Sequence, residues 1–108
     1  HYRERINFHG RAIVVESLEG PNRTLIDAGQ AGTVVRFDSE EGPQSVLRGF
    51  AIIGGRHARH AGGIHADHAS PTIEGNVVVG NHGGRHGSGI SLLASAAQVL
   101  GNRIEFNR

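Results

Sequence analysis

The sequence predicts an all-β solenoid, a parallel β-helix of about four coils with three short parallel sheets. Three observations predict it: short apolar groups bounded by turn residues, an internal repeat of 26 residues, and no helical periodicity within the repeat. The chain has 108 residues, which is enough for one small domain. Cysteine is absent, so disulfides and thiolate metal sites are excluded.

The apolar groups are about three residues long, and each is bounded by Gly, Asn, Ser or Pro. They lie at residues 13–15, 33–35, 51–53 and 77–79. With 17 glycines and three prolines, this punctuation is typical of strands and turns. Only the segment from Leu92 to Leu100 looks briefly helical, and it lacks a capping residue.

The repeat is clearest between residues 62–81 and 88–107, which align without gaps at an offset of 26 residues. The matched pairs are Gly63 with Gly89, Ile64 with Ile90, Ile73 with Val99, Gly75 with Gly101, Asn76 with Asn102, and Asn81 with Asn107. The same offset aligns residues 46–55 with residues 72–81. Internal repeats of this length indicate a solenoid.

Each repeat contains three β segments, and the signature of leucine-rich repeats is missing. Stacked turns would therefore form three inward ladders about 4.8 Å apart along the stack. The ladders are Leu47/Ile73/Val99, Ile52/Val78/Ile104 and Val35/Ile64/Ile90. Asn76 and Asn102 fall at the same bend, where asparagine tolerates a left-handed backbone and can hydrogen-bond along the stack; Phe50 replaces asparagine one turn earlier.

The whole chain is expected to be one domain, with coils at residues 1–32, 33–61, 62–87 and 88–108. The first third fits least tightly. Its strands are expected at residues 6–8, 12–15 and 24–27, and its insertions at residues 18–23 and 38–44. Within the second insertion, Glu40 and Glu41 are interpreted as a solvated loop pair.

Several stretches resemble the right-handed parallel β-helix repeat proteins of the pectate-lyase-like superfamily. They are INFHGRAIVVES, TLIDAG, VLRGFAIIGG, GGIHADHASPTIEGNVVVGN and the final GNRIEFN. The resemblance covers nearly the whole chain, and it implies a right-handed helix and an extracellular or cell-surface location. The superfamily includes polysaccharide lyases and hydrolases, adhesins and phage tailspikes, so the fold does not choose the function.

Lyases of this kind resemble one another in an aspartate cluster that holds calcium, beside a basic residue. The aspartates here are Asp27, Asp38 and Asp67, and they are expected at non-equivalent places in the repeat. Glu74 is expected beside Arg48 on the adjacent coil as a cross-strand ion pair. Asp27 is expected to close a turn. No catalytic residue is therefore predicted; a polysaccharide lyase or glycoside hydrolase is the enzymatic alternative.

The stretch RHARHAGGIHADH (56–68) holds four histidines and one aspartate. One hypothesis is a Zn or Ni site formed by His60 and His86 with His57 or His82, because imidazole suits these metals. The other is that these are solvated turn residues, which the arginines beside them favour by repulsion of a cation. His65 follows the inward Ile64 and is expected to point outward. Protonation near pH 6 would charge this edge strongly.

A short solenoid has two open ends, and stacking is expected there. The expected end residues are Ile6, Phe8, Ile13, Leu92, Ile104 and Phe106. The sequence thus predicts a non-catalytic structural module of a secreted or cell-surface protein, stacked on itself or part of a longer β-helix. The alternative is a polysaccharide-binding or polysaccharide-degrading module.

A net charge of +1 and short apolar runs exclude a nucleic-acid partner and a membrane span. Asn22 begins a glycosylation sequon.

Overall fold

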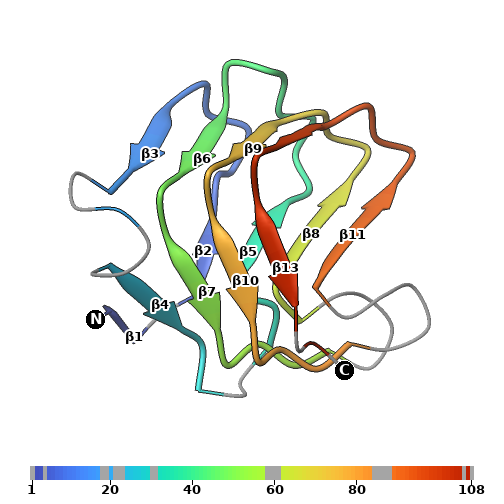
Figure 1. Cartoon of the computed structure of the whole chain (residues 1–108). Helices are drawn as coiled ribbons and strands as arrows, with labels where there is room; N and C mark the ends of the chain where they lie inside the picture. Colours follow the sequence, from blue (N-terminus) through green and yellow to red (C-terminus); the bar gives the residue numbers. More distant parts are fainter. Residues whose placement is uncertain are drawn as a thin grey trace.

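The computed structural model describes residues 2–3, 5–17, 20, 24–29, 32–57, 62–83, 89–105 and 107. These residues form thirteen short β-strands and no helix, and the strands wind around a common axis (Figure 1). The predicted parallel β-solenoid is confirmed, because every strand pair is parallel and joins successive turns of the chain.

The strands form three sheets, which we call A, B and C. Sheet A contains β1 (Tyr2–Arg3), β4 (Leu25–Asp27), β7 (Ala51–Ile53), β10 (Val77–Val79) and β13 (Arg103–Glu105). Sheet B contains β2 (Ile6–Asn7), β5 (Val35–Phe37), β8 (Ile64–Asp67) and β11 (Ile90–Leu93). Sheet C contains β3 (Val14–Glu16), β6 (Val46–Arg48), β9 (Thr72–Glu74) and β12 (Gln98–Leu100). From the first to the last strand of sheets B and C the chain completes about three turns, which gives four stacked levels.

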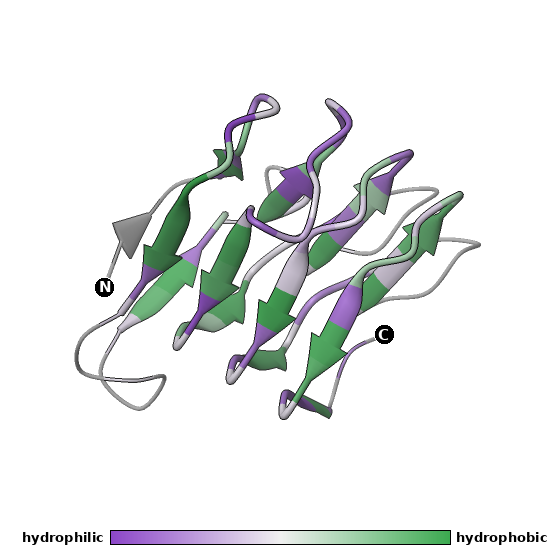
Figure 2. Ribbon diagram, turned by 90° about the horizontal axis from the view of Figure 1, so that it is seen from above, coloured by the Kyte–Doolittle hydropathy of each residue, from purple (hydrophilic) through white to green (hydrophobic). Residues whose placement is uncertain are grey.

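The strand register is that of the expected ladders. In sheet C, Ile73 pairs with Leu47 and Val99; in sheet A, Val78 pairs with Ile52 and Ile104; in sheet B, Ile64 pairs with Val35 and Ile90. At the middle levels these side chains fill the interior, and Leu47, Ile52, Ile64, Ile73 and Val78 are fully buried. Apolar segments recur at each level along the axis (Figure 2). Burial of these ladders is the main source of stability.

The brief helix expected between Leu92 and Leu100 is wrong. Residues 90–93 belong to β11 and residues 98–100 to β12, with a bend between them. Ala94 has a φ of 49°, which interrupts any right-handed helix. Pairing of both strands with the coil below therefore overrides the helix propensity of leucine and alanine.

The solvated pair expected at Glu40 and Glu41 is wrong for Glu41, which is only 2% exposed. Its Oε1 accepts a hydrogen bond from the backbone N–H of Ser39 at 2.8 Å, and its Oε2 accepts one from Gly10 at 3.1 Å. The bends of two successive coils leave these N–H groups without strand partners, so a carboxylate that reaches both is held inside. Glu40 is exposed.

Candidate functional site

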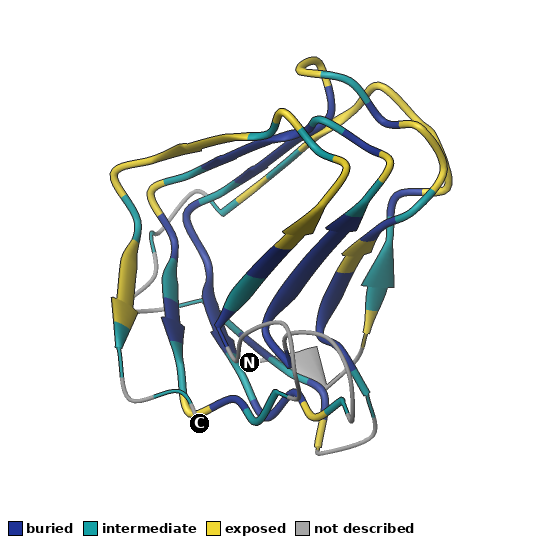
Figure 3. Ribbon diagram, turned by 90° about the vertical axis from the view of Figure 1, so that its right-hand side faces the viewer, coloured by how far each residue is buried: buried dark blue, intermediate teal, exposed yellow. Residues whose placement is uncertain are grey.

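The last coil is the most exposed apolar surface of the described solenoid. Val99 is 37% exposed and Ile104 is 46% exposed, although Ile73 and Val78 directly below them are 0% exposed. Leu92, Leu93 and Leu100 on the same coil are also exposed. Figure 3 shows this contrast between buried middle levels and exposed end levels. The last coil thus has the side chains of an inner coil without the neighbour that would cover them.

An asparagine column lies at the bend between sheets C and A. Asn76 accepts the backbone N–H of Phe50 on Oδ1 at 3.0 Å and donates from Nδ2 to the carbonyl of Leu47 at 3.1 Å. Asn102 repeats both contacts one level later, with the N–H of Asn76 at 2.9 Å and the carbonyl of Ile73 at 2.9 Å. Each side-chain amide therefore ties its own coil to the preceding one.

A second asparagine column follows the strands of sheet A. Asn81 accepts the N–H of Gly55 at 2.9 Å and donates to the carbonyl of Ile52 at 2.9 Å. Asn107 accepts the N–H of Asn81 at 3.1 Å and donates to the carbonyl of Val78 at 2.9 Å. Asn76 and Asn81 are almost completely buried. Both columns thus run in one direction and reach the open C-terminal level.

The opposite end differs from this arrangement. Ile13 and Val14 are exposed, Ile6 is half-buried, and Phe8 is 2% exposed. The ring of Phe8 packs on the ring of Phe37 with centroids 4.4 Å apart. Phe8 therefore belongs to the core and adds nothing to an exposed end. Phe106, which was also expected at an end, lies outside the described residues.

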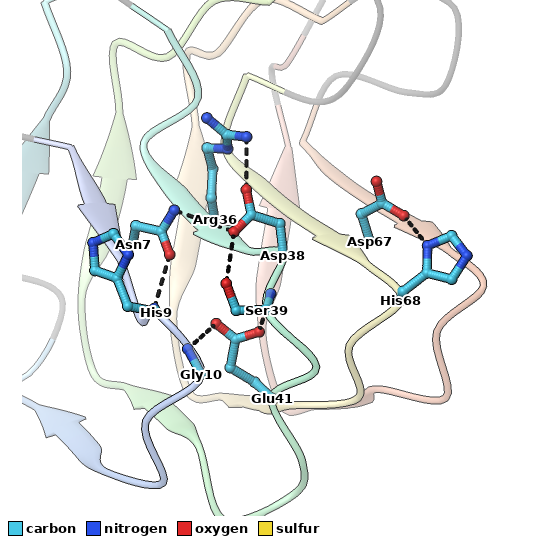
Figure 4. Close-up of polar contacts among 9 residues, drawn as sticks. All are labelled: Asn7, His9, Gly10, Arg36, Asp38, Ser39, Glu41, Asp67 and His68. Atoms are coloured by element: carbon cyan, nitrogen blue, oxygen red, sulfur yellow. Dashed lines mark hydrogen bonds and ion pairs between the residues drawn. The ribbon is translucent and has the colours of Figure 1, made fainter.

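The sequence predicted non-equivalent positions for the three aspartates, and this is wrong for Asp38 and Asp67 at the ends of the sheet B strands. Phe37 pairs with Ala66, so Asp38 and Asp67 occupy equivalent positions on adjacent coils. Asp38 accepts hydrogen bonds from Arg36 at 2.7 Å and from Asn7 at 3.2 Å, whereas Asp67 contacts His68 at 2.5 Å (Figure 4). The offset between these coils is larger here than the 26 residues of the repeat, because the segment after Asp38 is longer. The expected step from Val35 to Ile64 has the same larger offset, so it already implied that Asp38 and Asp67 are equivalent. The two carboxylates have separate partners.

Asp27 and Arg48 make contacts that stabilise a turn and a row of neighbouring strands, respectively. Asp27 accepts the N–H of Gly29 at 2.7 Å and so closes a turn, as expected. Arg48 binds Glu74 as expected, and it also binds Glu16 at 2.7 Å. Hydrogen bonds to Glu16, and to a smaller extent to Glu74, raise the pKa of Arg48 above its usual value. The guanidinium group of this ion-pair ladder therefore stays charged at any ordinary pH.

His65 lies on β8 between two core residues, Ile64 and Ala66. Strand alternation places it on the outer face, yet it is only 4% exposed. Its Nδ1 lies 2.7 Å from Oγ of the equally buried Ser91 on the adjacent strand. Outward orientation therefore does not mean solvent exposure here, because His65 occupies an inner strand between Arg36 and Ser91.

The proposed histidine metal site falls mainly on residues that the structure does not describe. His60 and His86 lie outside the described residues, as does Asn22. The backbone of His57 donates to the carbonyl of His82 at 3.1 Å, so these two connections lie on adjacent coils. Among the described residues, no group of three or more His, Asp or Glu side chains could hold a metal ion.

A polar pocket of about 350 Å³ opens beside the first two strands of sheet B. It is lined by Arg5, Ile6, Asn7, Thr33 and Arg36. The pocket brings two guanidinium groups together, and arginine can bind a carboxylate through two parallel hydrogen bonds. Arg36 and Asn7 already donate to the carboxylate of Asp38, so an anion bound here would compete with Asp38. No pattern in the sequence points directly to this pocket, since Arg5 and Arg36 become neighbours only when the coils stack.

No protein-family model, curated protein or solved structure matches this chain. In the described part of the chain, no helix has the length and apolar character to cross a membrane. The features that stand out are therefore the open last coil, with its two asparagine columns, and the arginine pocket on sheet B.

Proposed function

We propose that the chain is a non-catalytic structural module of a secreted or cell-surface β-helix, and that its ends stack on further β-coils. The observation that carries this proposal is the last coil, whose ladder residues Val99 and Ile104 are exposed in register with fully buried equivalents. An uncovered strand edge with apolar side chains is a template for pairing with another chain segment. The further coils can belong to a longer β-helix or to a second copy of the chain.

The proposal extends to the family. Three parallel sheets, a short repeat and bends with stacked asparagines support membership of the pectate-lyase-like superfamily of right-handed β-helices. A structural role is favoured over catalysis because Asp38 and Asp67 are held by separate partners. An extracellular location follows from the same assignment.

The test compares the purified chain with the Ile104→Lys variant at rising concentration, by light scattering and electron microscopy. If the further coils belong to a second copy, the wild-type chain should associate and Ile104→Lys should remain monomeric, because a charge at the open end opposes stacking. Val79→Lys, on an inner strand, is the control and should associate like the wild type. Ordered filaments would show a rise of about 19 Å per copy, from four levels of about 4.8 Å. A monomeric wild-type chain whose end also rejects an added coil would overturn the proposal.

The arginine pocket supports a second candidate function, binding of an acidic polysaccharide. Arg5 and Arg36 line it with Asn7, and a uronate carboxylate has the charge and geometry that arginine binds. A titration with galacturonate oligosaccharides would test this, with a neutral glucan as the reference ligand. Arg36→Gln should weaken binding at least tenfold, while Arg103→Gln, on the last strand of sheet A, should leave it unchanged. Equal binding of both glycans, or no binding, would remove this candidate.

A further inference from the structure

We propose that the C-terminal end face binds a β-coil that carries asparagine at both bends, and that the first coil of a second copy is not this partner. The end face is defined by Val99, Asn102, Ile104 and Asn107. This inference rests on the proposed function and adds the chemistry of the partner to it. The partner coil is recognised by the two side-chain amides that it places over the end face.

The end face presents two sites that each match one carboxamide. Within the two columns, each asparagine Oδ1 accepts a backbone N–H from the preceding coil, and its Nδ2 donates to a carbonyl there. The equivalent groups of the last level are the N–H groups of Asn102 and Asn107 and the carbonyls of Val99 and Ile104. Among the described residues, neither N–H has an acceptor and neither carbonyl has a side-chain amide. A further coil with two asparagines would pair all four groups.

Gly63 and Gly89 directly precede β8 and β11 of sheet B. Their surroundings show that an asparagine in the second column requires a glycine at this position of the same coil. A Cβ on Gly63 would lie 3.2 Å from Nδ2 of Asn81, and a Cβ on Gly89 would lie 2.9 Å from Nδ2 of Asn107. One level earlier the arrangement is reversed. There Val34 takes the place of the glycine, and Gly55 takes the place of the asparagine. Glycine and asparagine thus occur together, and the partner coil is expected to carry both.

The first coil of a second copy does not offer these groups. In sheet A the end strand of a second copy is β1, which pairs with β4 through Tyr2 and Ile26, so the β4 edge is already occupied. The coil of β4 itself carries Thr24 at the first column position and Gly29 at the second, because Leu25 pairs with Ala51. Head-to-tail stacking of copies would therefore cover the apolar ladders but leave the N–H groups of Asn102 and Asn107 without carboxamide acceptors. Each N–H buried in this way would lose its hydrogen bond to water without gaining another, which opposes stacking. The chemistry favours an asparagine-bearing coil over the chain's own first coil.

The experiment extends the full chain at its C-terminus with a second copy of residues 83–108, which supplies both asparagines. A matched extension has alanine in place of both of these asparagines. Hydrogen exchange of the Asn102 and Asn107 backbone amides is the readout, with exchange at Val78 as a control for global folding. We expect the asparagine extension to slow exchange at both amides at least tenfold and the alanine extension to leave it nearly unchanged.

Three outcomes would overturn this inference. Equal protection by both extensions would show that the amides are not recognised, and an asparagine extension that stays disordered would show that the face does not accept such a coil. Wild-type filaments that protect the Asn102 and Asn107 amides would identify the second copy as the partner. That last result would leave the proposed structural role intact, whereas failure of both the extension and self-association would remove the role as well.

Discussion

The third and fourth coils follow the same 26-residue template but differ in what covers them. Ile73 and Val78 are 0% exposed, whereas their equivalents Val99 and Ile104 are 37% and 46% exposed. The strands, bends and asparagines are alike in both coils. The difference shows that burial in a solenoid is decided by the neighbouring coil, because each repeat contacts only the repeats beside it. Four pairs of substitutions compare a well-covered contact with one that involves the last coil.

The largest difference is expected between Gly63→Ala and Gly89→Ala. A Cβ on Gly63 would meet the backbone carbonyl oxygen of Gly89, and it would lie 2.7 Å from Cγ1 of the fully buried Val78. A Cβ on Gly89 would lie nearest to side-chain atoms, those of Ile104 and Asn107, which can shift more easily than a backbone carbonyl. We expect Gly63→Ala to cost about 3 kcal/mol and Gly89→Ala clearly less, measured by urea denaturation. Equal costs would mean that the last coil is as rigid as the third.

The next pair tests burial itself with the same chemical change. Val78→Ala removes a fully buried side chain and is expected to cost about 2 kcal/mol, while Val99→Ala, at the open end, should cost about 1 kcal/mol or less. Denaturation midpoints at low protein concentration give both values. If the cost of Val99→Ala rose with protein concentration, association at the end face would be covering Val99.

The third pair compares the links between the bends of successive coils. Glu41 accepts two backbone N–H groups while buried, whereas Oγ of Ser70 accepts one bond from the exposed Ala96 at 3.1 Å. We expect Glu41→Ala to cost about 1–2 kcal/mol and Ser70→Ala a few tenths, again by denaturation. Glu40→Gln serves as the exposed control. A neutral Glu41→Ala would show that water replaces the carboxylate.

The smallest difference concerns ion pairs. Arg48 bridges Glu16 and Glu74 across three levels, whereas Arg103 pairs with Glu105 on the last strand of sheet A at 2.9 Å. Both sites are well exposed, so Arg48→Gln should lower the denaturation midpoint slightly and Arg103→Gln hardly at all. The effect of Arg48→Gln should disappear in 1 M salt, where the Debye length is about 3 Å. A loss that persists in salt would indicate packing of the Arg48 side chain instead.

The sequence by itself determined the fold class and the register of the ladders. A gap-free repeat of 26 residues places Leu47, Ile73 and Val99 in one column, because identical steps along a solenoid return to the same side of it. The asparagines at equivalent bends are part of the same periodic signal. Periodicity is a property of the chain alone, so it can be found without coordinates.

Only the tertiary structure decided which side chains are covered and which distant residues meet. Burial of Glu41 and His65 depends on neighbours from other coils, and Glu41 meets the N–H of Gly10 only where two coils stack. The two open carboxamide sites likewise exist only where stacking stops. These features come from contacts between levels, and a repeat read along one chain specifies which residues are equivalent but not what surrounds each of them.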